Sequence, residues 1–310
     1  MHSGRAAQYI VYQPPFPVGR RTYTCTPKSM RLTVLVDNNT FIDRYFYGEP
    51  GVSYLIEEGD FKILFDVGYS DAFIKNAQKM NISLLDVDFI VLSHGHIDHT
   101  GGLEPLIKYF KEAAIEKIDH KKPKMVAHPL ALLTKKCEEF EDIGSLIPEK
   151  KLALHFRLQL SREPLWLSEH LVFLGEIERK NDFEAQKPMG KRVKKNTVED
   201  KDDYLLDDSA VVYKSLEGLV IITGCSHAGI CNIVEYAQKI CKDDRIIDII
   251  GGFHLLQLTN EQLQPTLEYM KQLKPTALHA CHCTDLKAKI ALSRGVNLIE
   301  VGVGLRLEYD

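Results

Sequence analysis

Residues 93–102 read Ser-His-Gly-His-Ile-Asp-His-Thr-Gly-Gly and directly follow the apolar segment Phe89–Leu92. The run places three imidazoles and a carboxylate within six positions, at His94, His96, Asp98 and His99. Histidines at alternate positions can present two nitrogens to one cation, and the Asp-His pair can face a second cation. Imidazole with carboxylate is the ligand set of zinc and its first-row neighbours. The spacing therefore predicts a metal site, and a merely polar, histidine-rich loop is the weaker interpretation.

Composition and charge restrict the classes of protein to consider. The 310 residues are 45% hydrophobic and 26% charged, as in ordinary globular proteins, and the formal net charge is -4. A negative net charge gives no indication of nucleic-acid binding. No apolar run is long enough to span a bilayer. Seven cysteines, an odd number without framework spacing, favour reduced thiols and a cytoplasmic location. We therefore expect neither nucleic acid nor a membrane as partner.

The chain divides by composition into an N-terminal segment and one long domain. Residues 1–30 hold four prolines and four basic residues but no acidic residue. We expect an extended arm here, with an organellar leader as the alternative. Residues 31–310 are expected to form a single domain with a charged, flexible insertion near 176–208. The insertion is interpreted either as a solvated loop or as a flap over the site, whose basic run Lys187–Lys195 meets an anionic substrate.

Hydrophobic periodicity predicts two similar halves, each with strands followed by mixed helices and strands. In the first half we expect strands at Arg31–Asp37, Ser53–Glu57, Phe61–Phe65, Phe89–Leu92 and Met125–His128, and helices at Asp71–Met80 and Gly102–Ala114. In the second half we expect strands at Leu171–Leu174, Ala210–Lys214, Leu219–Thr223, Ile246–Ile250, Thr276–Cys281, Asn297–Glu300 and Val303–Leu307. Its helices are expected to begin near Ala228 and to cover Asn260–Leu273 and Asp285–Arg294. Two sheets with helices outside predict an α/β fold, a four-layer αββα sandwich.

Other polar residues follow apolar strands in the same way as the histidine run. Three of them are histidines, and we expect at least two to bind metal: His227, His254 and His282. The segment His279–Cys283 is a weak zinc-finger candidate, because alternate residues of a strand face opposite sides.

Two further groups at strand ends have open roles. Cys225 is either a soft metal ligand or a small buried residue. Asp66 is expected to orient a ligand histidine rather than to bind metal directly. Asp207 and Asp208 could act in either role.

Together, Asp66, the His94-x-His96-x-Asp98-His99 run and the later strand-end histidines resemble the metallo-β-lactamase superfamily from about residue 31 onward. The fold of that superfamily is the αββα sandwich. Three segments, residues 223–230 (TGCSHAGI), 251–255 (GGFHL) and 282–284 (HCT), resemble one subgroup of it. That subgroup includes the archaeal-type 7,8-dihydropterin-6-methyl-4-(β-D-ribofuranosyl)aminobenzene-5'-phosphate synthases.

The resemblance implies a role for each matching residue. His94 and His96 would hold a first metal, Asp98 and His99 a second, and His282 would also bind the second. The Gly-His-Thr-x-Gly run that usually supplies a third histidine is absent, and His227 is its natural substitute. Cys225 stands where a bridging aspartate is usual. These departures disfavour a β-lactamase or a glyoxalase II and favour the subgroup.

The resemblance also implies an activity. We expect a transferase in which an arylamine attacks a dihydropterin diphosphate and pyrophosphate leaves, with Asp98 and His227 as catalytic residues and a small phosphorylated substrate as partner. The cofactor would be Zn²⁺, one or two ions, with Mn²⁺, Fe²⁺ or Mg²⁺ as alternatives. A metal-dependent hydrolase of a phosphodiester, thioester or lactone is the second interpretation, and a non-catalytic metal-binding protein the third. A homo-oligomer is a further expectation.

Overall fold

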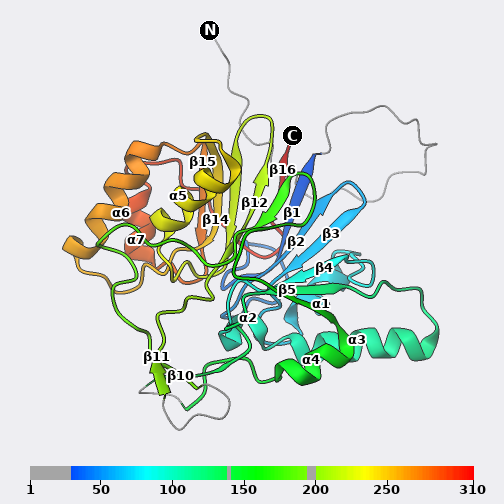
Figure 1. The fold of residues 1–310 in the computed structure, drawn as a ribbon. Coiled ribbons are helices and arrows are strands. Elements are labelled where there is room, and N and C mark those ends of the chain that lie inside the picture. Colours follow the sequence, from blue (N-terminus) through cyan, green and yellow to red (C-terminus); the bar gives the residue numbers. More distant parts are fainter. Residues whose placement is uncertain (1–28, 138–140, 194–199) are drawn as a thin grey trace.

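The computed structural model describes residues 29–137, 141–193 and 200–310, and two large β-sheets face each other at its centre (Figure 1). Nearly all of the expected N-terminal arm lies outside these residues. The first sheet has the strand order β16-β1-β2-β3-β4-β5-β7. Its strands are β1 (Met30–Val36), β2 (Ser53–Glu58), β3 (Phe61–Phe65), β4 (Phe89–Val91), β5 (Lys124–Ala127), β7 (Arg157–Leu160) and β16 (Arg306–Tyr309).

The second sheet has the strand order β15-β14-β13-β12-β9-β8. Its strands are β8 (Leu165–Trp166), β9 (Leu171–Phe173), β12 (Ala210–Lys214), β13 (Leu219–Thr223), β14 (Ile246–Gly252) and β15 (Ala277–Cys281). Helices α1 (Ala72–Lys79), α3 (Leu103–Glu116) and α4 (Glu149–His155) pack on the first sheet. Helices α5 (Ile230–Cys241), α6 (Asn260–Leu273) and α7 (Leu286–Leu292) pack on the second. No helix in the described part of the chain is long and apolar enough to cross a membrane.

Three apolar clusters fill the three interfaces between four layers. Side chains alternate along a strand, so one strand serves two interfaces. In β2, Tyr54 and Ile56 pack between the two sheets, whereas Leu55 packs against the helices of the first half. In β12, Val211 packs between the sheets, whereas Val212 packs against the helices of the second half. The predicted αββα sandwich is therefore confirmed.

Two antiparallel hairpins and the principal predicted helices are present. Strands β2 and β3 pair antiparallel, as do β12 and β13. Helix α6 begins after Thr259 with a complete capping box, in which Thr259 and Gln262 exchange hydrogen bonds.

The C-terminal strands differ from the prediction. Asn297–Glu300 contributes a single bridge, between Leu298 and Leu278. The last strand begins at Arg306 rather than at Val303. A turn precedes it, because Gly304 adopts φ 91° and the Leu305 amide donates to the Gly302 carbonyl.

The charged insertion contains structure that the sequence pattern did not indicate. Strands β10 (Lys191–Val193) and β11 (Asp200–Asp202) form a small sheet with β6 (Thr134–Lys136). At the end of the insertion Asp203, Asp207 and Asp208 are buried rather than solvated. The solvated-loop interpretation is wrong for this end, because the ammonium of Lys135, itself buried, pairs with Asp203 and Asp207.

Candidate metal centre

Five strands end at the same edge of the sandwich and place polar side chains there. Strands β3 and β4 run parallel, as do β13, β14 and β15, so their carboxyl ends point the same way. The side chains come one to three residues after the strands end: Asp66, His94, Cys225, His254 and His282. Short α2 (Ile97–Thr100) begins directly after His96 and carries Asp98 and His99. The fold therefore gathers residues that are distant in sequence.

One group of ligand atoms comes from His94, His96 and His227. Their ring centroids lie 4.7 to 4.8 Å apart. The Nε2 atoms of His94 and His96 and both ring nitrogens of His227 are buried without a hydrogen-bond partner among the described residues. A buried polar atom left without a partner costs about 1–3 kcal/mol, so native proteins rarely leave a cluster of them. This donor set fits a zinc-like cation.

A second group consists of Asp98, His99, Cys225 and His282. The Nε2 atom of His99 lies 3.1 Å from Cys225 Sγ and 3.6 Å from Asp98 Oδ2. The Nε2 atom of His282 lies 3.3 Å from the same carboxylate oxygen. The ligand atoms of these four residues lie within 4.8 Å of one another. Those of His94, Cys225 and His227 also lie within 4.8 Å of one another. The thiol thus lies between two candidate positions for a cation, and it could serve both.

Asp66 holds the histidine run in place. Its Oδ2 accepts hydrogen bonds from Ser93 Oγ and from His99 Nδ1, both 2.6 Å long, and its Oδ1 accepts one from the Ser93 amide at 2.7 Å. The Ser93 hydroxyl, having donated to Asp66, can accept from His94 Nδ1 at 2.9 Å. These contacts turn the Nε2 atoms of both histidines toward the cluster, as carboxylate–histidine pairs do in metal sites. The geometry thus supports the orienting role expected of Asp66.

Two residues that hold His282 were missed by the sequence analysis. Asp37 Oδ1 accepts from the His282 amide at 3.0 Å, and Asn38 Oδ1 accepts from His282 Nδ1 at 2.9 Å. Asp37 comes directly after β1, as Asp66 comes directly after β3, so its position at a strand end was an available signal. Asn38 carried no such signal.

The two neighbouring aspartates at the end of the insertion have different roles. Asp207 Oδ2 accepts from the amide of Gly95 at 2.9 Å, and its Oδ1 accepts from Lys135 Nζ at 2.8 Å. Asp207 therefore supports the backbone between the two histidines of the first group. A side chain at Gly95 would meet the Ala131 carbonyl oxygen at 2.1 Å, so only glycine fits there. Asp208 Oδ2 accepts from the Ala228 amide at 2.8 Å, and its Oδ1 is buried without a described partner.

The remaining candidates lie beside the two groups or away from them. His254 packs its ring 4.3 Å from that of His227, and its buried Nδ1 has no described partner. His279 instead pairs with Asp248, at 2.9 Å, and so does not face the cluster. The zinc-finger interpretation of His279–Cys283 is therefore not supported. Individual ligand roles across the whole set stay predictions.

The electrostatics of the cluster favour neutral imidazoles in the first group. Burial lowers the pKa of His94 and His227 well below the usual value, and burial lowers that of His96 to about 4. Burial would also lower the pKa of His99, but Asp98 and Asp66 outweigh it and raise this pKa to about 9. Neutral imidazoles offer their lone pairs directly, whereas a cation bound at His99 must displace a proton.

Comparisons with known proteins identify the family of this chain. A model of the metallo-β-lactamase superfamily matches residues 47–143. The chain is 31% identical over 281 residues to the 7,8-dihydropterin-6-methyl-4-(β-D-ribofuranosyl)-aminobenzene-5'-phosphate synthase of Methanocaldococcus jannaschii, covering 84% of this chain and 90% of that protein. An uncharacterised protein of the same organism is 31% identical over 278 residues, which covers 88% of this chain and 98% of that protein.

Solved structures give the same result. The crystal structure of Tm1679, described as a metal-dependent hydrolase of the β-lactamase superfamily, matches with a TM-score of 0.75 and 28% identity over 91% of this chain and 99% of that one. YhfI from Bacillus subtilis shares the fold at a TM-score of 0.55 and 12% identity, covering 91% of this chain and 100% of that one. The fold implies a divalent metal, and the histidine, aspartate and cysteine side chains described above can hold it. The chain belongs to the metallo-β-lactamase superfamily, in the group that includes the Methanocaldococcus synthase.

Proposed function

We propose that the chain is a metal-dependent transferase that joins a dihydropterin diphosphate to a ribofuranosylaminobenzene phosphate. The observation that carries the proposal is the 31% identity to a synthase named for that product, over most of both chains. We propose zinc as the metal, with one or two ions, and manganese, iron or magnesium as alternatives.

In the proposed reaction the arylamine nitrogen attacks the methylene carbon of the pterin. The carbon–oxygen bond to the diphosphate breaks, its electron pair leaves with pyrophosphate, and the amine proton passes to solvent. Because the methylene carbon is already activated, the main demand is to stabilise the leaving diphosphate. A bound divalent cation supplies that stabilisation as a Lewis acid.

The chain's own residues would hold the cation and orient the amine. His94, His96 and His227 would hold the first ion, and Asp98, His99 and His282 the second, with Cys225 between them. Burial would raise the pKa of Asp98, but His99 and His282 outweigh it and keep this pKa below its ordinary value. The carboxylate is therefore ionised at neutral pH, and it is the most exposed of these groups. We propose that it accepts a hydrogen bond from the attacking amine.

The substrate in this proposal is a small phosphorylated molecule. Lys187 and Lys191 of the insertion are exposed, and we propose that they meet its phosphate groups. Lys194 and Lys195, the remaining lysines of the basic run, lie outside the described residues.

A hydrolase is the second candidate, favoured by the similarity to Tm1679, which is described as a metal-dependent hydrolase. In that case Asp98 would orient a water molecule toward a phosphodiester, thioester or lactone instead of orienting an amine.

One assay separates the two candidates. The metal-loaded protein is incubated with a dihydropterin diphosphate and the arylamine phosphate, and in parallel with bis-p-nitrophenyl phosphate. The transferase predicts a coupled product and pyrophosphate in equal amounts. Turnover of the diester alone would replace the proposal with a hydrolase, and turnover of neither would contradict both. His96→Ala should abolish activity, while His120→Ala, at an exposed histidine remote from the cluster, should not.

A further inference from the structure

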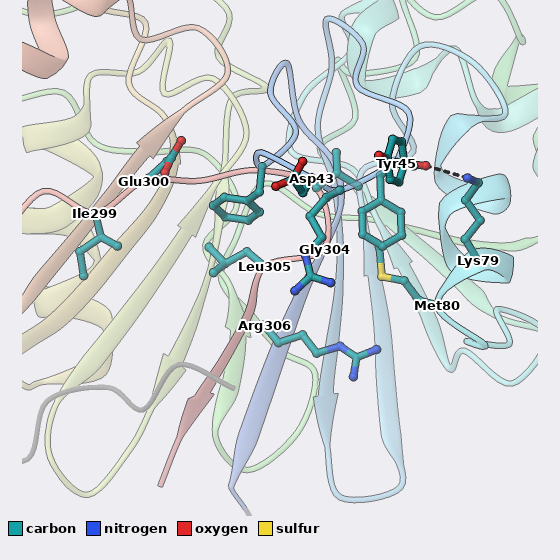
Figure 2. Close-up of a pocket in the computed structure, with 13 residues that line it drawn as sticks. Asp43, Tyr45, Lys79, Met80, Ile299, Glu300, Gly304, Leu305 and Arg306 are labelled. Atoms are coloured by element: carbon teal, nitrogen blue, oxygen red, sulfur yellow. Dashed lines mark hydrogen bonds between the residues drawn. The ribbon is translucent and has the colours of Figure 1, made fainter. Parts of the chain in front are cut away.

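A hollow of about 710 Å³ lies between the loop after β1, the end of α1 and residues 299–306 (Figure 2). None of the candidate metal ligands lines it. Its apolar wall comes from both sides of the hollow: Phe41, Phe46, Met80, Val303 and Leu305. A hollow of this size can accept a ligand or side chains from another chain.

Two large apolar side chains project into solvent beside this hollow. Ile42 is 91% exposed and Tyr45 is 83% exposed. Adjacent exposed apolar side chains on a folded surface often mark a contact with a partner. The hollow and the projecting side chains belong to one face of the molecule, because Tyr45 itself lines the hollow.

The loop that carries these side chains is held firmly by α1. Lys79 Nζ donates to the Tyr45 carbonyl at 2.6 Å, a contact drawn in Figure 2. Asn76 donates to the Tyr47 carbonyl at 2.8 Å and accepts from the Tyr47 amide at 2.9 Å. At the tip, Asp43 adopts φ 60° and the Arg44 amide donates to the Phe41 carbonyl. The backbone of the loop that presents Ile42 and Tyr45 is therefore held by specific contacts.

The same face carries both signs of charge. Asp43 and Glu300 line the hollow together with Arg44 and Arg306, and no ion pair joins any of these four side chains to another described residue. A small anion would pair with the arginines but would leave the carboxylates unpaired and Ile42 in water. A second copy of the same face carries both signs of charge and the same apolar side chains, so a two-fold contact can pair unlike charges and cover Ile42.

We infer that this face is the contact of a two-fold homodimer. Ile42 and Tyr45 of each copy enter the hollow of the other, and the carboxylates of each copy meet the arginines of the other. In such an isologous contact each pair of residues occurs twice, because either copy can supply either member of the pair. The inference concerns a surface apart from the metal centre and does not depend on the proposed reaction.

Sedimentation velocity over a range of concentrations tests the dimer. The wild type should show a monomer–dimer equilibrium, and Ile42→Asp or Tyr45→Asp should raise the dimer Kd by about tenfold or more. Leu216→Asp is the matched control, because Leu216 is 74% exposed at the turn between β12 and β13. A monomeric wild type, a dimer unaffected by Ile42→Asp, or equal loss in the control would each overturn the inference.

Two charge-reversal variants test the pairing of carboxylates with arginines across the contact. Recovery of a dimer in their mixture also shows that loss of the dimer in each variant is not due to misfolding. One variant carries Asp43→Arg and Glu300→Arg, and the other carries Arg44→Glu and Arg306→Glu. Each variant alone should be monomeric, because like charges face each other, and a mixture should form heterodimers at wild-type affinity. Circular dichroism checks that both variants are folded. If the mixture stays monomeric, or if the wild-type hollow instead takes up a small anion such as inorganic phosphate as a monomer, the inference is wrong.

Discussion

Three histidines of the candidate metal centre each use one ring nitrogen in a hydrogen bond within the protein, which turns the other toward the cluster: His94 with Ser93, His99 with Asp66, and His282 with Asn38. The sequence could reveal Asp66, because it follows a strand directly. It could not reveal Asn38, because that contact joins positions 244 residues apart and depends on how β1 and β15 meet. At the scale of residues, candidate ligands are therefore easier to recognise in the sequence than the residues that orient them.

Asp66→Asn tests the most connected of these supports. The change replaces an acceptor oxygen with an amide group that faces two donors, His99 Nδ1 and Ser93 Oγ. We expect metal affinity to fall about 10- to 100-fold, as for other carboxylates that orient ligand histidines. Zinc competition with a chromophoric chelator measures this. Asp88→Asn is the control, because the Asp88 carboxylate accepts from the Lys62 amide and from Lys121 Nζ, far from the site. Equal affinity in wild type and Asp66→Asn would contradict the orienting role.

His128 provides a pH dependence away from the metal ligands. Its Nδ1 accepts from the Leu130 amide and its Nε2 lies 3.1 Å from Glu176 Oε2, so the neutral form fits best. Burial lowers its pKa from the usual value, although Asp207 and Glu176 oppose this. The unfolded chain then binds the proton more readily. This contribution to stability is complete above about pH 6.5 and is lost as the pH falls through the folded pKa.

Comparison with His128→Gln isolates that contribution, because the histidine cluster titrates in both proteins. Urea unfolding in chelator between pH 8 and pH 5 should show a steeper loss of unfolding free energy in the wild type. Parallel curves would show that His128 titrates normally in the folded protein.

At the scale of elements, the long helices and the longer strands followed from hydrophobic periodicity. Short strands such as β6 and β10 did not, because Thr134–Lys136 and Lys191–Val193 are too short and too charged to show an alternating pattern. A buried ion pair joins β6 to the end of the insertion and to the histidine run, and β10 pairs with β6. Lys135 in β6 reaches Asp203 after β11 and Asp207 beside Gly95, each at 2.8 Å. Charge patterning along the sequence cannot reveal such a contact.

Lys135→Met tests this junction. It removes one partner of a buried ion pair and leaves two carboxylates without compensation, so we expect a loss of about 3–5 kcal/mol of unfolding free energy. Urea denaturation at pH 7.5 measures it. Lys108→Met removes an exposed pair with Glu104 one helical turn away, and should cost no more than about 0.5 kcal/mol. Similar small losses in both variants would mean that Lys135 is not a structural junction.

At the scale of the whole molecule, the two halves were predictable because each repeats strands and outer helices. The contact between the halves was harder to predict, because it depends on which faces of β2 and β12 turn inward. The candidate metal centre lies across that contact. His94, His96, Asp98 and His99 come from the first half, and Cys225, His227 and His282 come from the second. A cation held by both groups would therefore link the two sheets.

Metal removal should then destabilise the entire sandwich rather than one loop. A metal at 100 times its Kd stabilises the folded state by about 2.7 kcal/mol, which corresponds to a Tm shift of about 5 °C in a domain of this size. Calorimetry with and without EDTA measures the shift. In His96→Ala, which lacks one candidate ligand, the melting temperatures with and without EDTA should differ by less than in the wild type, because less metal is bound at the start. An EDTA shift of the same size in wild type and in His96→Ala would place the stabilising metal elsewhere. A wild type with no shift at all would show that cation binding does not join the two halves.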